Sequence, residues 1–233
     1  TVVGGYQQFR RLVVKALYDG PITSRIVVLD GYTGSAKTDV LKALATLGVR
    51  VVDLEGLAHH RGSVLGAMDT EQPTLLAFET GSAMALEAAA PDQPVVVEAE
   101  SSKGGERLVP PALWKAMRDA PRIVIDAPVA ARAAYLARAY RDATANADAF
   151  GARLDKLIPY HGRETVGRWR MMVEDRDHEK LAAELIETHY DPRYAKSRAR
   201  ADRPVLATLR ADALDEGSIR RLAGEVKAAL RRR

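Results

Sequence analysis

The feature that most constrains this chain is a glycine-rich loop between an apolar run and a helical stretch. Residues 30–38 read DGYTGSAKT, follow the apolar residues 26–29, and precede residues 39–47, which have helical spacing. A strand–loop–helix unit of this kind gathers backbone N–H groups and the positive end of a helix around one anion. Gly31, Lys37 and Thr38 fit the P-loop pattern G-x-x-x-x-G-K-[ST], whereas Ala36 replaces its second glycine. The sequence therefore predicts a phosphate-binding loop.

Individual residues of this loop are expected to bind different parts of the phosphate ligand and its metal ion. Lys37 would reach the outer phosphates, and the Thr38 hydroxyl would bind Mg²⁺. The methyl group of Ala36 matters only if its position requires a positive φ, and we expect the loop to be intact. The predicted phosphate ligands are these loop residues and two arginines of a later helix: Gly31, Thr33, Gly34, Ser35, Ala36, Lys37, Thr38, Asp39, Arg132 and Arg138. The alternative is a turn whose glycines only permit the chain to reverse.

Short apolar runs alternate with helical stretches along the chain. The runs are 26–29, 49–53, 94–98, 122–126 and 204–209, and helical spacing marks 6–18, 39–47, 74–89, 110–120 and 129–140. This alternation predicts an α/β fold: a five-stranded parallel sheet with helices on both faces, as in nucleotide-kinase-like P-loop NTPases.

The predicted domains follow from where the strands stop. Residues 144–203 show no clear strand and are too long for a bare loop, so we expect a helical insertion there, with helices at 154–158, 164–174 and 178–189. Residues 1–25 are expected to form a lead-in helix and an interdomain joint. The P-loop domain would comprise 26–143 and 204–233, ending in a helix at 218–233.

Composition excludes several classes of site. The 233 residues include no cysteine, which excludes disulfides, thiolate metal sites and a cysteine nucleophile within this chain. No run reaches transmembrane length, so we expect a cytoplasmic protein without a membrane partner. The formal net charge of +4 permits an anionic partner. Because the sequence begins with Thr1, we expect a piece of a longer protein.

Two carboxylates follow the third predicted strand. Residues 94–98 are an apolar run that ends at Glu98, where a P-loop fold places the acid that holds Mg²⁺ through water. Glu100 would be a second carboxylate, acting as a base or as a partner for Lys37. Because apolar runs ending in glutamate are common, this prediction rests on the spacing from the loop.

Polar residues crowd past the second predicted strand, where residues 53–63 read DLEGLAHHRGS. Ligands of open α/β sheets bind at the carboxyl ends of the strands, so we expect contacts with an anion or substrate here. Zinc is disfavoured because adjacent histidines rarely share one ion and no third nitrogen or sulfur ligand follows. The candidate substrate or RNA contacts are Asp53, Glu55, His59, His60 and Arg61. The alternative is a solvated loop.

Two further segments are basic. Residues 189–203, HYDPRYAKSRARADR, hold five Lys or Arg and two tyrosines, a mixture suited to phosphates and unpaired bases. The candidates there are Tyr190, Arg193, Tyr194, Lys196 and Arg198; the alternative is a basic surface loop. Arg132, Arg138 and Arg141 follow the fourth strand, where nucleotide kinases carry an arginine-bearing lid. For these arginines the alternative is a solvated helix face.

Together these motifs resemble one family, the P-loop part of tRNA 2-selenouridine synthase. The resemblance is carried in order by 4–10 (GGYQQFR), 31–38 (GYTGSAKT), 53–63 (DLEGLAHHRGS), 72–74 (QPT), 94–101 (PVVVEAES), 157–162 (LIPYHG) and 189–198 (HYDPRYAKSR). It implies an enzyme that modifies the wobble uridine of tRNA. Such enzymes pair a rhodanese domain, which carries a catalytic cysteine, with a P-loop domain. They replace the sulfur of 2-thiouridine with selenium from selenophosphate, through a geranylated intermediate made from geranyl diphosphate.

This chain departs from that pattern in Ala36 and in having no rhodanese cysteine. The resemblance implies a transferase that is incomplete for selenation without a rhodanese partner, in cis or in trans. Its loop would bind ATP, GTP or geranyl diphosphate, with Mg²⁺ on Thr38 and Glu98, and its helical insertion would bind the anticodon arm of tRNA. The residues expected in catalysis are Lys37, Glu98, Glu100 and Arg61. A small-molecule kinase with Glu98 or Glu100 as base, and a non-catalytic tRNA-binding module, remain as alternatives.

Overall fold

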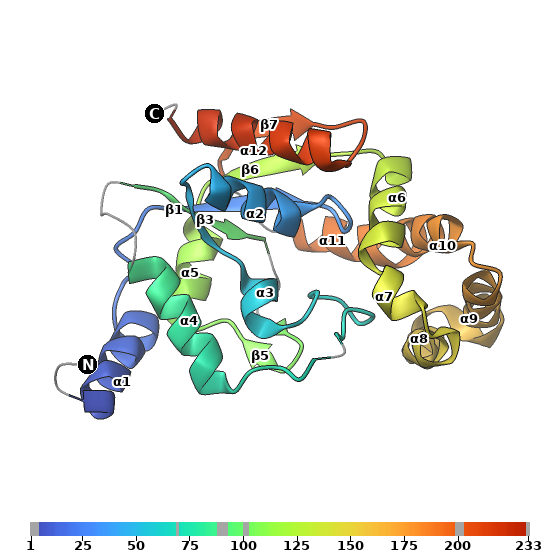
Figure 1. The fold of residues 1–233 in the computed structure, drawn as a ribbon, viewed down its shortest axis with the longest axis horizontal. Coiled ribbons are helices and arrows are strands. Elements are labelled where there is room, and N and C mark those ends of the chain that lie inside the picture. The colour runs from blue at the N-terminus through green and yellow to red at the C-terminus, as the bar shows by residue number, and fades with distance from the viewer. Residues whose placement is uncertain (1–4, 69, 88–92, 100–102, 199–202, 232–233) are drawn as a thin grey trace.

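A five-stranded, all-parallel sheet forms the centre of the molecule (Figure 1). The computed structural model describes residues 5–68, 70–87, 93–99, 103–198 and 203–231. The strands lie side by side in the order β2 (Arg50–Val52), β3 (Val95–Glu98), β1 (Ile26–Gly31), β6 (Arg122–Asp126) and β7 (Val205–Arg210). The predicted α/β fold with a parallel P-loop sheet is therefore confirmed.

The central strands are apolar because both of their faces are covered. All six residues of β1 and all four of β3 are buried. Val27 and Leu29 of β1 pack beneath α2 (Lys37–Thr46) and α12 (Glu216–Arg231). Ile26 and Val28 point to the opposite face. There they meet α1 (Gly5–Val14), the π-helical turn Lys15–Asp19, α4 (Leu75–Glu87) and α5 (Pro111–Asp119).

The register of the sheet brings the two predicted phosphate-site elements together. Leu29 pairs with Glu98, so the end of β3 lies beside the end of β1 and the start of the loop. On the other side of β1, Gly31 pairs with Ile125 of β6. The carboxyl ends of β1, β3 and β6 thus form one edge, which is where ligands of such sheets bind.

A helical lobe follows β6 and lies to the right in Figure 1. Its elements are α6 (Val129–Ala139), α7 (Arg141–Thr144), α8 (Ala147–Leu154), the 3₁₀ turn Asp155–Leu157, α9 (Ile158–Glu174), α10 (His178–Leu185), the π-helical turn Ile186–Tyr190 and α11 (Asp191–Arg198). Trp169, Leu154 and Leu157 have no exposed surface and anchor a separate core for α7 to α10. α11 then returns the chain toward the sheet. The described part of residues 144–203 contains no strand.

Several short helices and strands were not predicted from the sequence. They are α3 (Leu54–Ala58), α7, α8, α11 and a hairpin of β4 (Lys103–Gly104) with β5 (Arg107–Leu108). α11 contains no Val, Leu, Ile, Met or Phe, so no apolar period could reveal it. No helix among the described residues is both long and apolar enough to cross a membrane.

Candidate phosphate-binding site

The loop between β1 and α2 owes its tight path to two glycines. A Cβ at Gly31 would lie 2.4 Å from the Ser35 hydroxyl oxygen, so no side chain fits there. Gly34 has φ +85°, and a Cβ on it would lie 3.0 Å from the carbonyl oxygen of Arg132 and from Leu136 Cγ. Both positions therefore require glycine, one for close approach and the other also for its backbone conformation.

Ala36, which replaces the second glycine of the P-loop pattern, lies in the left-handed region. Its φ and ψ are +59° and +25°, and only 3% of its surface is exposed. The position thus needs the positive φ that the sequence left open, and its methyl group carries a cost of about 1–2 kcal/mol. The loop nevertheless keeps its shape, and Ala36 O accepts a hydrogen bond from Val40 N, 2.9 Å away, that begins α2.

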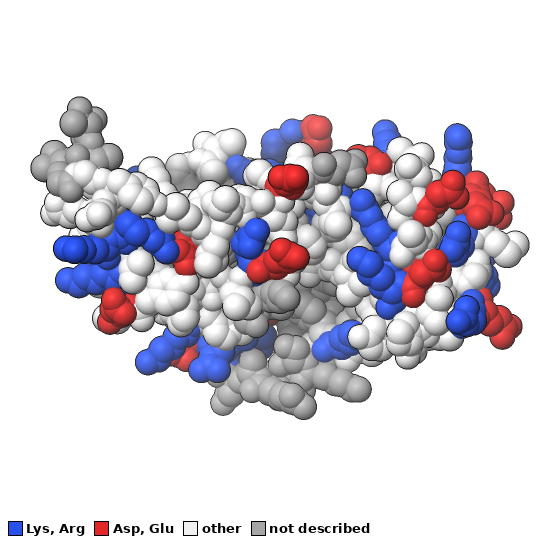
Figure 2. Space-filling view, turned by 90° about the horizontal axis from the view of Figure 1, so that it is seen from below, with Lys and Arg blue, Asp and Glu red and all other residues white. Residues whose placement is uncertain are grey.

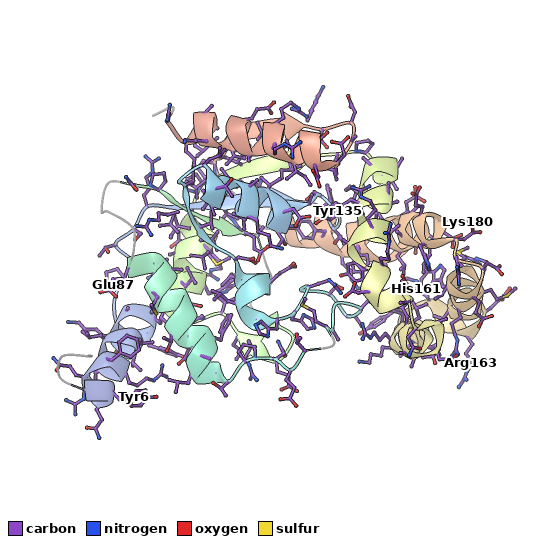
Figure 3. The ribbon with its side chains drawn as sticks, in the orientation of Figure 1. Tyr6, Glu87, Tyr135, His161, Arg163 and Lys180 are labelled. Atoms are coloured by element: carbon purple, nitrogen blue, oxygen red, sulfur yellow. The ribbon has the colours of Figure 1, made fainter. Side chains whose placement is uncertain are left out.

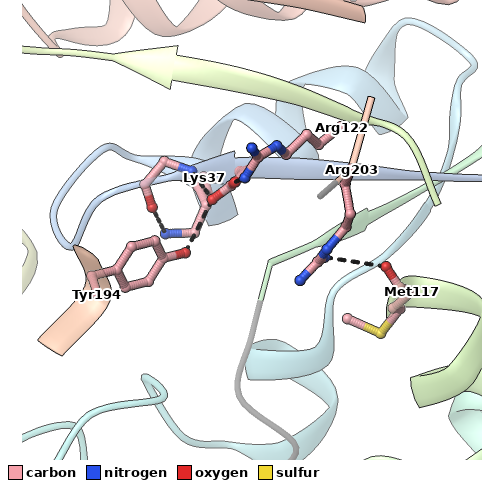
Figure 4. A network of polar contacts seen from close by, with 7 residues as sticks. Lys37, Met117, Arg122, Tyr194 and Arg203 are labelled. Carbon is pink, nitrogen blue, oxygen red and sulfur yellow. Dashed lines mark hydrogen bonds and ion pairs between the residues drawn. The ribbon is translucent and has the colours of Figure 1, made fainter. Parts of the chain in front are cut away.

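Lys37 lies folded against its own loop. Its Nζ donates to the carbonyl oxygen of Gly31 at 3.1 Å (Figure 4). This contact uses one of the three N–H donors of the ammonium group. The charge is therefore held beside the loop amides, where an anion would need it.

Three oxygen-bearing side chains converge at the start of α2. Thr38 Oγ1 lies 3.1 Å from Glu55 Oε2 and 3.2 Å from Glu98 Oε2. Glu98 has no exposed surface, and its Oε1 accepts a 2.7 Å hydrogen bond from Glu55 N. The Thr38 hydroxyl has one proton and can donate to only one carboxylate at a time. The predicted pair Thr38 and Glu98 is brought together, and Glu55 joins it.

This arrangement fits a hard divalent cation. Mg²⁺ is usually held by one or two carboxylates together with substrate phosphates and several waters. Among the residues that the structure describes, no three His, Asp or Glu side chains form a metal cage. A cation at Thr38, Glu55 and Glu98 would therefore share its remaining positions with phosphate oxygens and water.

Three predicted residues cannot be related to this geometry. Glu100 lies outside the described residues. Lys196 and Arg198 belong to α11, but their side chains are outside the described part of the chain.

Asp30, at the end of β1, is a site residue that the sequence analysis missed. Asp30 is 5% exposed, and its carboxylate accepts from Gly31 N at 2.7 Å, from Arg122 Nη1 at 3.1 Å and from the Tyr194 hydroxyl at 3.1 Å (Figure 4). The rings of Tyr194 and Tyr32 lie 5.5 Å apart. Tyr194, predicted to contact tRNA, therefore lies against the phosphate loop. An acid at the end of a buried strand, directly before the loop glycine, was the available indication.

Arg132 reaches the loop but is largely committed to protein partners. Its Nε donates to Ala127 O, and Nη1 donates to Thr33 O at 3.2 Å. Nη1 and Nη2 also donate to the two carboxylate oxygens of Asp191 at 2.9 and 2.8 Å. These contacts occupy four of its five N–H groups. Arg132 therefore positions the loop, and only one N–H is left over from these bonds.

Arg138 and Asp39 have different surroundings. Arg138 Nη2 donates to Leu214 O at 2.8 Å, and its guanidinium lies 5.9 Å from the ring of Tyr135. The Tyr135 hydroxyl donates to Asp39 Oδ2 at 2.9 Å. Burial, helped by the Asp39 carboxylate, raises the pKa of Tyr135 well above its ordinary value, so this hydroxyl stays a donor. Arg138 Nη1 also donates to Ala134 O at 3.3 Å, so its described hydrogen bonds lie within α6 and with the segment just before α12.

The loop after β2 is shaped by its own polar side chains. Asp53 caps α3, because its Oδ1 accepts from Gly56 N at 2.7 Å. His59 has φ +48° and its Nδ1 lies 3.2 Å from Glu71 O. His60 Nδ1 accepts from Gly62 N at 3.1 Å, and burial lowers the pKa of this histidine. Through these contacts, Asp53, His59 and His60 stabilise the local conformation of this loop.

Arg61 is the exception in this segment. Its Nη2 donates to Asp142 Oδ2 at 2.7 Å, and its guanidinium lies 4.8 Å from the Tyr140 ring. Its Nη1 is buried and has no hydrogen-bond partner among the described residues. A buried, unpaired guanidinium nitrogen is costly and points to a missing acceptor. Arg61 Nη1 is therefore a buried donor whose acceptor is not among the described residues.

An apolar pocket, with about 450 Å³ of empty space that is partly open to solvent, begins at the loop and extends into the helical lobe. Its wall includes Thr33, Leu65, Leu136, Tyr140, Phe150, Leu181, Leu185 and Tyr190. Burial raises the pKa of Tyr140 and of Tyr190, so both hydroxyls stay protonated. Tyr190, predicted as an RNA contact, lines this pocket. No pattern in the sequence indicated this pocket, because its walls come from separate helices.

Known proteins match this chain along most of its length. The model of the tRNA 2-selenouridine synthase AAA domain matches residues 24–156. The tRNA 2-selenouridine synthase of Hahella chejuensis is 36% identical over 142 residues, which cover 60% of this chain and 36% of that protein. The enzyme of the same name from Cupriavidus pinatubonensis is 30% identical over 243 residues, covering 92% of this chain and 65% of that protein.

The match therefore spans between about a third and two thirds of these relatives' own length. The family model covers more than half of the chain, including β1, the loop, the Glu98 strand and α6. The predicted resemblance is confirmed by both comparisons. The chain belongs to the family of the tRNA 2-selenouridine synthase AAA domain.

Proposed function

We propose that this chain is the phosphate-binding portion of a tRNA-modifying transferase, and that its loop binds the diphosphate of a substrate with a hydrocarbon tail. One observation carries the proposal: the phosphate loop and the apolar pocket share Thr33. A ligand with an anionic head and an apolar tail would fill both. Geranyl diphosphate, the donor that the family resemblance implies, has this form.

The pocket favours such a tail over a nucleoside. Removing a hydrocarbon chain from water stabilises the complex by about 25 cal/mol per Å². A base and ribose would instead leave most of their polar groups unpaired against Leu136, Phe150 and Leu181.

The chemistry needs no protein nucleophile. Transfer of the geranyl group would form a bond between the sulfur of 2-thiouridine and the geranyl carbon, and break the bond from that carbon to the diphosphate oxygen. The bonding electron pair leaves with the diphosphate, and the uracil N–H proton is released to solvent. Lys37, the loop amides and Arg61 Nη1 would stabilise the charge that grows on the leaving group. A chain without cysteine can perform this step.

Mg²⁺ is the cation proposed at Thr38, Glu55 and Glu98. When bound, it would neutralise part of the diphosphate charge. The protein's own part is to hold these oxygens at the start of α2, through the register of β1 with β3.

The proposed RNA partner is the anticodon arm of tRNA, bound along the helical lobe and α11. Figure 2 shows Lys and Arg side chains, mixed with Asp and Glu side chains, over the helical lobe. The Lys and Arg side chains would neutralise RNA phosphates. Replacement of sulfur by selenium would further need selenophosphate and a rhodanese domain, carried by the same or by another polypeptide.

A second candidate function is a small-molecule kinase. The convergence of Thr38, Glu98 and Glu55 would also suit Mg²⁺ with ATP or GTP. A third candidate is a tRNA-binding module whose loop takes no phosphate ligand.

The test compares Lys37→Ala with Lys42→Ala, an exposed lysine of the same helix. Calorimetry would measure binding of geranyl diphosphate and of ATP, with Mg²⁺, and filter binding would measure tRNA. We expect Lys37→Ala to weaken geranyl diphosphate binding about 100-fold, since it removes charge-assisted hydrogen bonds worth about 1.5–3 kcal/mol each. Lys42→Ala should leave the affinity for geranyl diphosphate nearly unchanged. Lys37→Ala should leave the affinity for tRNA nearly unchanged.

Each other outcome favours a rival. Tight ATP binding and ATP turnover that is indifferent to tRNA would favour the kinase. Binding of tRNA without any phosphate ligand would favour the binding module. If Lys37→Ala leaves geranyl diphosphate affinity unchanged, the loop is not the site.

A further inference from the structure

Two motifs that the phosphate site does not use meet in the helical lobe. One is residues 157–162 (LIPYHG) and the other residues 189–194 (HYDPRY). His161 Nε2 lies 2.9 Å from His189 Nδ1, and Arg193 Nη1 lies 2.8 Å from that same nitrogen. The two motifs are therefore joined through the buried ring of His189.

The protons of this cluster can be assigned from its donors. A guanidinium can only donate, so His189 Nδ1 accepts from Arg193 and carries no proton. His161 Nε2 faces the same acceptor and must therefore donate. Burial, with help from the charges of Arg193 and His161, lowers the pKa of His189 to about 4, so it is neutral near pH 7. Arg193 Nη1 also donates to His189 O at 3.1 Å, so two hydrogen bonds to one residue hold this end of the guanidinium.

The fixed guanidinium lies on an exposed aromatic ring. Arg193 Cζ is 4.6 Å from the centroid of Tyr160, and Tyr160 is 63% exposed. Tyr160 precedes a kink in α9, where Gly162 has φ +80°. The cluster thus presents an open tyrosine ring that is backed by an immobilised cation.

We infer that Tyr160 and Arg193 form a stacking site for one unpaired base of the bound RNA. This inference rests on the proposed function, in which tRNA is the partner. Aromatic rings stack with any base, and an arginine beside the ring adds attraction to the base and to its phosphate. Because Arg193 is already held by His189, binding would cost little ordering of this side chain.

Arg193 of this stacking site belongs to α11, the helix that also contacts the phosphate loop. Arg193 is two residues from Asp191, which binds Arg132, and one residue from Tyr194, which binds Asp30. A base stacked on Tyr160 of α9 would therefore lie beside Arg193 of α11, the short helix that also lies against the loop. This would bring a neighbouring nucleotide toward the bound diphosphate.

The test uses an anticodon stem-loop RNA and three variants. Tyr160→Ala removes the ring, Tyr160→Phe retains it, and Tyr6→Ala is a matched control. Tyr6 is 60% exposed in α1, and Figure 3 shows it at the opposite end of the molecule from His161. Because both tyrosines are exposed, the variants should keep the wild-type melting temperature.

We expect Tyr160→Ala to weaken RNA binding about 10-fold, as a lost base stack would. Its salt dependence should match that of the wild type, since no phosphate contact is removed. Tyr160→Phe and Tyr6→Ala should bind within about 2-fold of the wild type. 2-Aminopurine, a fluorescent base, would replace each unpaired base of the RNA loop in turn. At one of these positions, the wild type should quench its fluorescence and Tyr160→Ala should not.

Equal RNA affinity of the wild type and Tyr160→Ala would overturn the stacking site and leave the proposed function standing. An equal loss with Tyr6→Ala would also overturn it, because the effect would not be specific to this ring. If the wild type does not bind RNA, the proposed partner is wrong and the stacking site fails with it.

Discussion

Asp191 accepts a hydrogen bond from each terminal nitrogen of Arg132, at 2.9 and 2.8 Å. Arg132 is 4% exposed and also donates to Thr33 O in the phosphate loop. One arginine thus joins α6, α11 and the loop. Because α11 also carries Tyr194 against Asp30, the conformation of the loop depends on a helix far along the chain.

Asp191→Asn tests this brace. The change leaves a buried guanidinium without its charged partner, and hydrogen bonds to charged groups contribute about 1.5–3 kcal/mol. We expect the free energy of unfolding in urea to fall by about 2 kcal/mol, and pyrophosphate affinity to fall with it. Glu216→Gln, in the exposed pair with Arg220, should change stability by less than about 0.5 kcal/mol. If Asp191→Asn and Glu216→Gln lower the free energy of unfolding equally, the pair of Arg132 and Asp191 contributes no more than an exposed ion pair.

Ala36→Gly tests the strain in the loop. Glycine adopts the left-handed conformation without the cost of a Cβ, so we expect the variant to be more stable than the wild type by about 0.5–1 kcal/mol. Ala45→Gly, at an exposed position inside α2, should have the opposite sign, about 0.5–1 kcal/mol less stable. Urea denaturation measures both. A loss of stability in Ala36→Gly would contradict a strained Ala36.

Glu98→Gln tests the cation site. For the wild type, we expect Mg²⁺ to raise pyrophosphate affinity at least about 10-fold, because carboxylate oxygens are hard ligands for this ion. Glu98→Gln should lose most of that increase while binding pyrophosphate without Mg²⁺ as before. The same measurement on Glu55→Gln shows how much the second carboxylate contributes to the Mg²⁺ effect. The same Mg²⁺ effect in both variants as in the wild type would exclude this cluster as the cation site.

The neutral His189 predicts how stability depends on pH. Its pKa is lowered from an ordinary value of 6.5 to about 4, so between these values the unfolded chain binds more protons than the folded one. The free energy of unfolding should therefore fall as the pH drops from 6.5 toward 4. His189→Gln, whose carbonyl can still accept from Arg193, should flatten this slope in urea titrations at pH 7, 6 and 5. An unchanged slope would show that His189 is not the titrating group.

The parts of the fold that the sequence predicted are local ones. β1, the loop and α2 follow from one continuous pattern, and the place of Glu98 follows from the rule that parallel strands end at one edge. The φ of Ala36 could not be predicted, because alanine does not itself favour a positive φ. The structure places this residue where the pattern expects glycine.

The contacts that the sequence missed join distant residues. Arg132 and Asp191 are 59 positions apart, and Asp30 and Tyr194 are 164 apart. Both depend on how the helical lobe folds back through α11, a polar helix without an apolar period. The pocket likewise has its walls on several helices that only tertiary packing brings together.

The most direct test of the proposed function compares the affinity of this chain for geranyl diphosphate and for inorganic pyrophosphate, under the same Mg²⁺ concentration. The two ligands share a diphosphate, so their ratio isolates the hydrocarbon tail. The pocket beside Thr33 predicts that geranyl diphosphate binds at least about 100-fold more tightly, since a buried CH₂ group contributes about 0.8 kcal/mol. Equal affinities would contradict the claim that loop and pocket hold one ligand.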